Sequence, residues 1–298
     1  MQTYKINNII DKNKENIAFL IGNGINRYAN ERKNLSWEDL LKCLWKEVTN
    51  KPIPNIPAGI SLTEYYDLLD IENTERINLQ KKVSRLLDSW KPLTHHNRII
   101  EIIQSINAPD LTTNFEETLA KTFGYKTYRI SDFGFTDFYP WTTNHGLIQH
   151  KSPMDGFGIW YINGMNYYHR SIRLGLSHYI GSVERVKKML PKRGYKKFLF
   201  HIDQKQWEGS QTWLHIIFNK PLFVFGVALK ENETFLRWLF VQRMKLYKKH
   251  FDQKPLGWYI AKIGEDITAD GKRFLLEKVG FEVIEVEDYK DIYENAWH

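Results

Sequence analysis

Cysteine is almost absent from this sequence of 298 residues, in which Cys43 stands alone. A disulfide within the chain needs two thiols, so a fold stapled by disulfides is excluded. A zinc module built from four cysteines is excluded for the same reason. His145, His150 and His169 are too scattered along the chain to indicate a zinc site of their own. We therefore expect no metal in this protein.

Long apolar runs are missing as well. No run approaches the roughly 18 residues that a membrane-spanning helix needs. The first residues lead into polar sequence, where a signal peptide would have its apolar region. We therefore expect a cytoplasmic protein that makes no contact with a membrane.

Acidic residues are outnumbered by basic ones, 35 against 42, which gives a formal net charge of +7. Such an excess is compatible with a plain basic surface, an anionic ligand or an acidic partner. The basic residues gather at 187–197 and 243–249, but neither cluster is interleaved with aromatic side chains as in nucleic-acid modules. Only the net charge favours a subunit associated with nucleic acid, so we expect no direct contact with it.

The pattern that is present is an alternation of short apolar runs, polar turns and amphipathic segments. The short runs predict strands at residues 16–22, 108–111, 125–130, 158–162, 171–176, 221–225, 256–263 and 282–286. Helical spacing predicts helices after a capping box at Ser36 and Asp39, at 62–70, 73–88 and 94–105, from 116, and at 178–190, 231–249 and 270–279, with a helical turn at 289–293. This alternation predicts an α/β fold, a Rossmann-like parallel sheet with helices on both faces.

We expect one domain over residues 1–298, with a smaller inserted module. Residues 131–158 are rich in Gly, Pro, Asp and Asn, and residues 192–212 are polar, so both stretches are candidates for an irregular insertion. Ligands of such folds bind outside the carboxyl ends of the strands. The polar turns that follow the predicted strands are therefore the candidate site.

The first of these turns is Gly22-Asn23-Gly24, directly after a buried strand. Glycines there let the backbone approach a pyrophosphate, and a following helix would offer free N–H groups. The third glycine of the dinucleotide fingerprint is replaced by Arg27, whose guanidinium is suited to phosphate or ribose. The alternative is that the glycines serve only a tight turn.

Two further turns carry amides. Thr112 and Thr113 lead into Asn114, which could hold a ribose hydroxyl or position a water, or could simply cap the next helix. Asn163-Gly164 follows another buried strand, and its plain interpretation is a common turn dipeptide.

Taken in order, these motifs resemble the sirtuin-like family, especially its bacterial branch in antiphage defence. The resemblance covers residues 16–290 and rests on Gly22-Asn23-Gly24-Ile25-Asn26, Thr112-Thr113-Asn114-Phe115-Glu116, Ile162-Asn163-Gly164, Ile172-Arg173-Leu174-Gly175 with Tyr179, and Val224-Phe225-Gly226. It implies NAD⁺ bound across the glycine turns, including Gly226, and cleavage of the nicotinamide–ribose bond. Asn114 matches the family's active-site asparagine.

Two departures from the family pattern matter. Cys43 alone cannot build the four-cysteine zinc module of the deacetylating members, which leaves NAD⁺ hydrolysis as in the defence members. Asn163 stands where the family has a histidine base, and an asparagine cannot exchange a proton in the useful pH range. Either another group such as His178 or His169 acts instead, or the chain is a non-catalytic regulator that binds NAD⁺, or the position has been engineered.

The resemblance thus implies an NAD⁺ glycohydrolase that depletes NAD⁺ in abortive infection. An enzyme of this kind is toxic when always active, so we expect a separate sensor or activator protein, or a homo- or hetero-oligomer, to switch it on. The helix at Phe235 is a candidate contact surface, although a core helix is the simpler interpretation. The alternative function is a regulatory subunit that binds NAD⁺ or another nucleotide without cleaving it.

Overall fold

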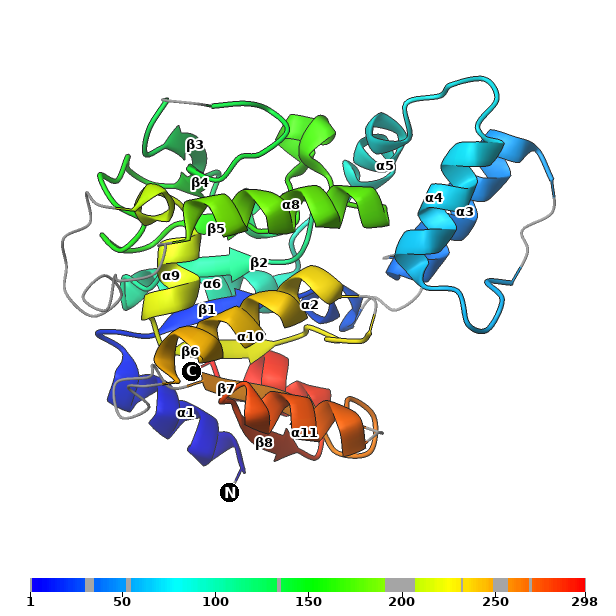
Figure 1. Ribbon diagram of the computed structural model, residues 1–298. Helices are drawn as coiled ribbons and strands as arrows, with labels where there is room; N and C mark the ends of the chain where they lie inside the picture. The colour runs from blue at the N-terminus through cyan, green and yellow to red at the C-terminus, as the bar shows by residue number, and fades with distance from the viewer. Residues whose placement is uncertain are drawn as a thin grey trace.

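The computed structural model describes residues 2–29, 35–51, 55–132, 135–190, 207–231, 233–248, 257–267 and 270–297. Its centre is one sheet with the strand order β3-β4-β5-β2-β1-β6-β7-β8 (Figure 1). The strands are β1 Ala18–Ile21, β2 Asp110–Thr112, β3 Lys126–Arg129, β4 Thr143–Gly146, β5 Ile159–Tyr161, β6 Leu222–Phe225, β7 Gly257–Lys262 and β8 Glu282–Val286. The α/β fold class is confirmed.

Strands β5, β2, β1, β6, β7 and β8 pair in parallel. When these six parallel strands alone are numbered from first to last along the chain, β5-β2-β1-β6-β7-β8 becomes the doubly wound order 3-2-1-4-5-6. The direction of this order reverses between β1 and β6. The polar turns after β1 and β6 therefore face each other across the reversal point. Such a point is where ligands bind in open α/β sheets.

Helices cover both faces of this sheet. One face carries α8 Leu176–Met189, α9 Leu214–Asn219, α10 Thr234–Tyr247 and α11 Asp270–Lys278, with α8 and α10 in front in Figure 1. The other carries α1 Gln2–Asn13, α6 Thr94–Ser105, α7 Thr118–Lys121 and the C-terminal turn Asp291–Asn295. Along β1, Ala18 and Leu20 pack on the first face, and Phe19 and Ile21 on the second. This period of two places apolar side chains in both layers.

Along the chain, a helical module is inserted between β1 and β2, which pair directly with each other in the sheet. It consists of α3 Trp37–Thr49, α4 Leu62–Glu72 and α5 Leu79–Leu87, which share an apolar cluster of their own. In Figure 1, α3 and α4 stand beyond the edge of the sheet where α2 Gly24–Arg27 follows β1. The expected inserted module is thus helical and lies outside both 131–158 and 192–212.

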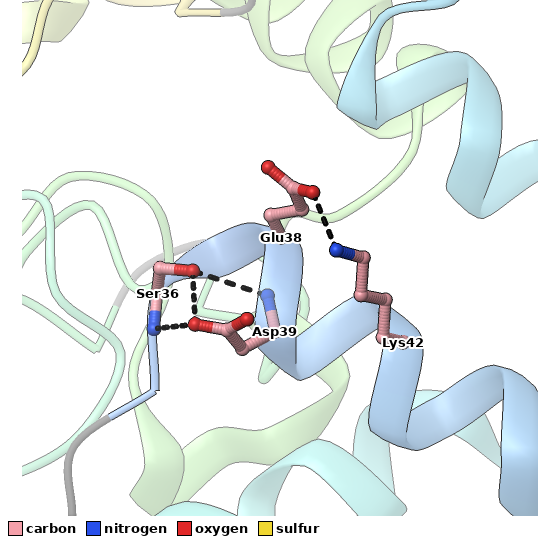
Figure 2. Close-up of polar contacts among 4 residues, drawn as sticks. All are labelled: Ser36, Glu38, Asp39 and Lys42. Carbon is pink, nitrogen blue, oxygen red and sulfur yellow. Dashed lines mark hydrogen bonds and ion pairs between the residues drawn. The ribbon is translucent and has the colours of Figure 1, made fainter. Parts of the chain in front are cut away.

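The predicted capping box at the start of α3 is present. The Ser36 hydroxyl accepts from the Asp39 N–H at 3.1 Å, and the Asp39 carboxylate accepts from the Ser36 N–H at 3.3 Å (Figure 2). Glu38 points the other way, toward the Lys42 ammonium at 2.6 Å. These contacts satisfy backbone groups that a helix start leaves without partners.

Three expectations about the elements need correction. The described part of the stretch 131–158, which omits 133 and 134, is irregular except for β4, which pairs antiparallel with β3 and β5. Residues 171–176 form no strand, because a 3-10 helix ends at Ser171 and α8 starts at Leu176. The helix expected from 116 has only four residues, α7. Most of 192–212 lies outside the described residues.

No helix within the described ranges is both long and apolar enough to span a bilayer. The helix at Phe235 is a core element, because Phe235, Leu239 and Phe240 of α10 are buried against the sheet. Arg243, counted above among a basic cluster, is fully buried in the same helix. The part of the other cluster at 191–197 lies outside the described residues.

Candidate functional site

A cavity of about 640 Å³ lies at the carboxyl edge of the sheet, next to the reversal of strand order. The sheet side of its wall contains most of the residues singled out in the sequence, namely Asn23, Gly24, Arg27, Thr113, Asn114, Asn163 and Gly226. The helical module closes the opposite side with apolar and aromatic side chains, among them Trp37, Leu40, Leu62 and Leu87. A cavity of this size accepts a ligand of several hundred cubic ångströms.

The glycines bring the turns after β1 and β6 into direct contact. The Gly22 N–H donates to Phe225 O at 3.0 Å, and the Gly24 N–H donates to Gly226 O at 2.9 Å. A Cβ atom at Gly22 would collide with the Gly226 carbonyl, and one at Gly24 would collide with the Tyr293 hydroxyl. Gly226 itself has φ +67°, a conformation that favours glycine. Gly22 does not line the cavity but holds its floor together.

The helix after this turn offers fewer N–H groups than expected. Helix α2 has four residues, and its N–H groups at Ile25, Asn26 and Arg27 donate to Gly22 O or Asn23 O at 3.1–3.3 Å. The expectation of free N–H groups for a pyrophosphate is therefore wrong at Gly24–Arg27. The positive charge at this point of the wall comes from the Arg27 side chain.

A buried polar network supports the turn from beneath. The Asn26 amide donates to the Glu116 carboxylate at 2.7 Å and to Asn23 Oδ1 at 3.0 Å. His96 Nδ1 accepts from the Leu93 N–H at 3.0 Å, so His96 Nε2 carries the proton and donates to Asn26 Oδ1 at 3.0 Å. The network ties α2, α6 and the segment after β2 together.

The two histidines at the start of α6, His95 and His96, face the buried interior and not the solvent. His95 and His96 are buried, and His95 Nε2 bonds Ile25 O at 2.7 Å. Burial lowers the pKa of His96 to about 3, and the neighbouring His95 contributes to the same shift. Both rings serve as fixed hydrogen-bonding groups. No group of three or more metal-ligating side chains occurs in the described part of the chain.

Asn114 lines the cavity with a buried side-chain amide. It is only 5% exposed, yet neither its Oδ1 nor its Nδ2 has a hydrogen-bond partner within the described structure. Its backbone is fixed, because its N–H donates to Thr112 Oγ1 at 3.1 Å and that hydroxyl donates to Ile21 O at 2.9 Å. Thr112 thus positions Asn114 without lining the cavity. A buried, unpaired amide costs free energy unless a ligand or water satisfies it.

Asn163 presents an acceptor to the same cavity. Its Nδ2 donates to Thr113 O at 3.3 Å, which leaves Oδ1 with no partner in the described structure. Gly164 follows with φ +94°, and a Cβ atom there would collide with the Ser171 carbonyl. The Asn-Gly pair is therefore both a required turn and a carrier of one oriented carbonyl oxygen.

His178, expected from the sequence as a possible substitute base, is not among the residues that line the cavity. It lies in the first turn of α8, where its Nδ1 accepts from the Leu174 N–H at 3.2 Å and the Gly175 N–H at 3.3 Å. Burial, with the nearby Arg173 charge, lowers its pKa to about 4. Its role in this structure is to cap a helix.

A further acidic pair follows the Phe225-Gly226 turn in the sequence. Glu231 and Glu233 lie where either contact with the adenine-side ribose or a solvated helix start is expected, and Glu231 is exposed. Glu233, in contrast, is half-buried and lines the cavity. Burial raises its pKa to about 7. The signal for Glu233 in the sequence is its position shortly after the Phe225-Gly226 turn.

Comparison of the sequence with models of known protein families found no match, and a search among curated proteins found none either.

Proposed function

We propose that the cavity binds NAD⁺ and that the protein is an NAD⁺ glycohydrolase of the sirtuin-like type. The observation that carries this proposal is Asn114, a buried amide without a partner in the described structure, in a cavity at the reversal point of a doubly wound sheet. Dinucleotides bind at this point of such sheets. The order of motifs along the chain, which resembles that family, supports the same ligand.

The wall supplies a partner for each part of the dinucleotide. Arg27 carries the positive charge that a pyrophosphate needs, and it lines the cavity beside the turns at Gly24 and Gly226. Asn114 offers two donors and an acceptor, and Asn163 offers an acceptor, which suits ribose hydroxyls and a water. The apolar wall of the module suits a flat ring system.

In the proposed reaction, water adds to C1′ of the nicotinamide ribose and the bond from C1′ to the pyridinium nitrogen breaks. The electron pair of that bond leaves with nicotinamide, and the products are nicotinamide, ADP-ribose and one proton. Asn114 orients the ribose and the attacking water. Positioning and a preorganised polar wall supply rate without a base, because the leaving group is good. A missing base costs roughly 10²- to 10⁴-fold.

The test is release of nicotinamide and ADP-ribose from NAD⁺ by this chain, by Asn114→Ala and by Asn163→His, assayed side by side. We expect slow cleavage by the unchanged chain, none by Asn114→Ala, and faster cleavage by Asn163→His. Cleavage by Asn114→Ala at the rate of the unchanged chain would contradict the proposed role of Asn114.

A second candidate function, an NAD⁺-binding regulatory subunit, is favoured by Asn163. Its amide is engaged with Thr113 O and cannot exchange a proton, and His178 caps a helix away from the cavity. Tight NAD⁺ binding without cleavage by either this chain or Asn163→His, in the presence of its physiological partner, would favour this function.

The proposed biological role is NAD⁺ depletion in antiphage defence, and it rests on the family resemblance alone. The same holds for a separate sensor or activator protein and for control through a homo- or hetero-oligomer. Infection of cells that carry the gene, with NAD⁺ measured over time, tests this role apart from the chemistry. An unchanged NAD⁺ level during abortive infection would contradict it.

A further inference from the structure

Glu233 closes the cavity on the side of β6 and β7. It precedes α10, and its Oε1 accepts from the Leu229 N–H at 3.1 Å. Its Oε2 is buried and has no hydrogen-bond partner within the described part of the chain. One oxygen is thus fixed by the protein, and the other is buried without a partner in the described structure, on a residue that lines the cavity.

Glu233 and the Asn163 turn lie on two sides of one aromatic residue. Tyr179 of α8 donates its hydroxyl to Arg173 O at 3.1 Å, and the Arg173 N–H donates to Asn163 O at 2.9 Å. The ring of Tyr179 packs against Phe235, two residues after Glu233, with centroids 6.4 Å apart. Glu233, Tyr179 and Asn163 all line the same cavity.

The groups around the Glu233 carboxyl come from every element packed against it. Those that carry charge or titrate are Lys230 and Arg237 near its own helix, Lys272 of α11, Tyr179 of α8 and Tyr259 of β7. Burial favours the neutral acid, whereas the Leu229 N–H and the three cations favour the carboxylate. The balance leaves the pKa raised, at about 7.

We propose that Glu233 recognises a ribose of the bound dinucleotide, its Oε2 accepting a hydrogen bond from a ribose hydroxyl, and that binding therefore tightens as the pH rises through neutrality. This inference rests on the proposed NAD⁺ binding and adds a specificity-determining residue to it. The ligand class is a nucleotide with a free ribose diol.

The direction of the pH dependence follows from the hydrogen bond. A hydroxyl donated to Oε2 stabilises the carboxylate, so the ligand must displace the proton wherever Glu233 is neutral. Below the pKa, the affinity falls by up to about tenfold for each unit of pH. Between about pH 8.5 and about pH 6, the dissociation constant should rise roughly tenfold.

The probe is carba-NAD⁺, an analogue that keeps the hydroxyls but resists cleavage, titrated calorimetrically between about pH 6 and about pH 8.5. Glu233→Gln keeps an oxygen for the Leu229 N–H but has no charge and cannot titrate. Glu231→Gln is the matched control, because Glu231 is exposed and does not line the cavity. Thermal melting of each variant verifies that it folds.

We expect the unchanged chain and Glu231→Gln to bind roughly tenfold more tightly at the upper pH. Glu233→Gln should bind weakly and equally at all pH values. Titrations in buffers of different ionisation enthalpy should show about half a proton released on binding at pH 7 by the unchanged chain, and none by Glu233→Gln.

Affinity that does not change with pH, or a pH profile that survives Glu233→Gln, would overturn the inference while leaving NAD⁺ binding in place. Absence of carba-NAD⁺ binding at every pH would instead refute the proposed function, and the inference with it. The two failures are therefore distinct.

Discussion

The two walls of the cavity are built in different ways. The sheet wall consists of turns in backbone contact, held from beneath by the buried network of Asn26, His96 and Glu116. The module wall consists mainly of apolar and aromatic side chains, with Ser36 and Glu38 beside them, on helices with a separate apolar cluster. The side-chain oxygens of Asn114 and Asn163, which have no partner in the described structure, lie on the sheet wall, and the Trp37 indole N–H, also without one, lies on the module wall. The sheet wall therefore supplies the amide and guanidinium groups proposed to bind the ligand, and the module wall supplies apolar surface opposite them.

The sheet unit, meaning the sheet with the helices on its two faces, and the helical module also differ in histidine content. Residues 36–93, which include the whole module, contain no histidine. His95, His96, His145 and His215 are buried in the sheet unit, and burial lowers their pKa values. Acid should therefore weaken the sheet unit first, because each buried neutral ring gains a proton more readily once unfolded.

The largest expected effect on stability is at the glycine contact. Gly22→Ala places a Cβ atom against the Gly226 carbonyl and the Val227 Cα, both of which belong to backbone that cannot rotate away. We expect a loss of about 3 kcal/mol or more in the free energy of unfolding, measured with urea. Gly271→Ala in α11, where the Cβ meets nothing within 4 Å, should leave stability equal or slightly raised. Equal stability of both variants would show that the turns are not in contact.

The next effect concerns the network beneath the turn. Asn26→Ala leaves the buried Glu116 oxygen and the His96 N–H without the amide that pairs them. We expect a loss of about 1–3 kcal/mol in urea unfolding. Asn26→Asp should cost more, because it places a second carboxylate beside Glu116. A variant Asn26→Asp as stable as the unchanged chain would contradict the network.

The pH dependence follows from His96. Its pKa is about 3 when folded and near 6.5 when unfolded, so its stabilising effect is complete above about pH 6.5 and falls as the pH drops toward 3. Between pH 7.5 and pH 5 this ring alone should cost about 2 kcal/mol. His96→Gln should lose that much less over the same interval. An identical decrease for both proteins would mean that His96 is not neutral in the fold.

The smallest effect belongs to the module wall. Ser36→Ala removes the capping box of α3 and should cost about 1 kcal/mol in urea unfolding. Lys42→Met breaks only an exposed ion pair with Glu38 and should leave stability within experimental error. Ligand affinity should change little in either variant. A strong loss of NAD⁺ affinity in Ser36→Ala would mean that the module wall also positions polar groups that bind the ligand.

Sequence patterns predicted the sheet centre because β1 and β6 are apolar runs that end in glycine turns. They could not predict β4, because Thr143, Asn144 and His145 are polar by type yet buried, and Gly146 has no apolar side chain. This strand is held by pairing with β3 and β5. The local pattern of apolar and polar residues does not indicate which strands will pair. The order of the strands likewise depends on contacts that are distant in the sequence.

For the candidate site, the sequence predicted the turns that line the cavity but not the contacts that support them. The turns at Gly24, Asn114 and Asn163 were found because each follows a buried strand, and parallel strands bring their carboxyl ends together. The burial of His96 was not predictable, because its partner Asn26 lies 70 residues away. The engagement of the α2 N–H groups depends on a helix of only four residues, a length that the sequence pattern does not fix.

The most direct measurement is the calorimetric affinity of NAD⁺ for the unchanged chain and for Asn114→Ala, with urea unfolding of both. The Asn114 amide has no partner in the described structure, so its removal should leave the free energy of unfolding within about 1 kcal/mol. We predict that the unchanged chain binds NAD⁺ and that Asn114→Ala binds at least about tenfold more weakly. Equal affinity of the two proteins, or no binding by the unchanged chain, would contradict the account.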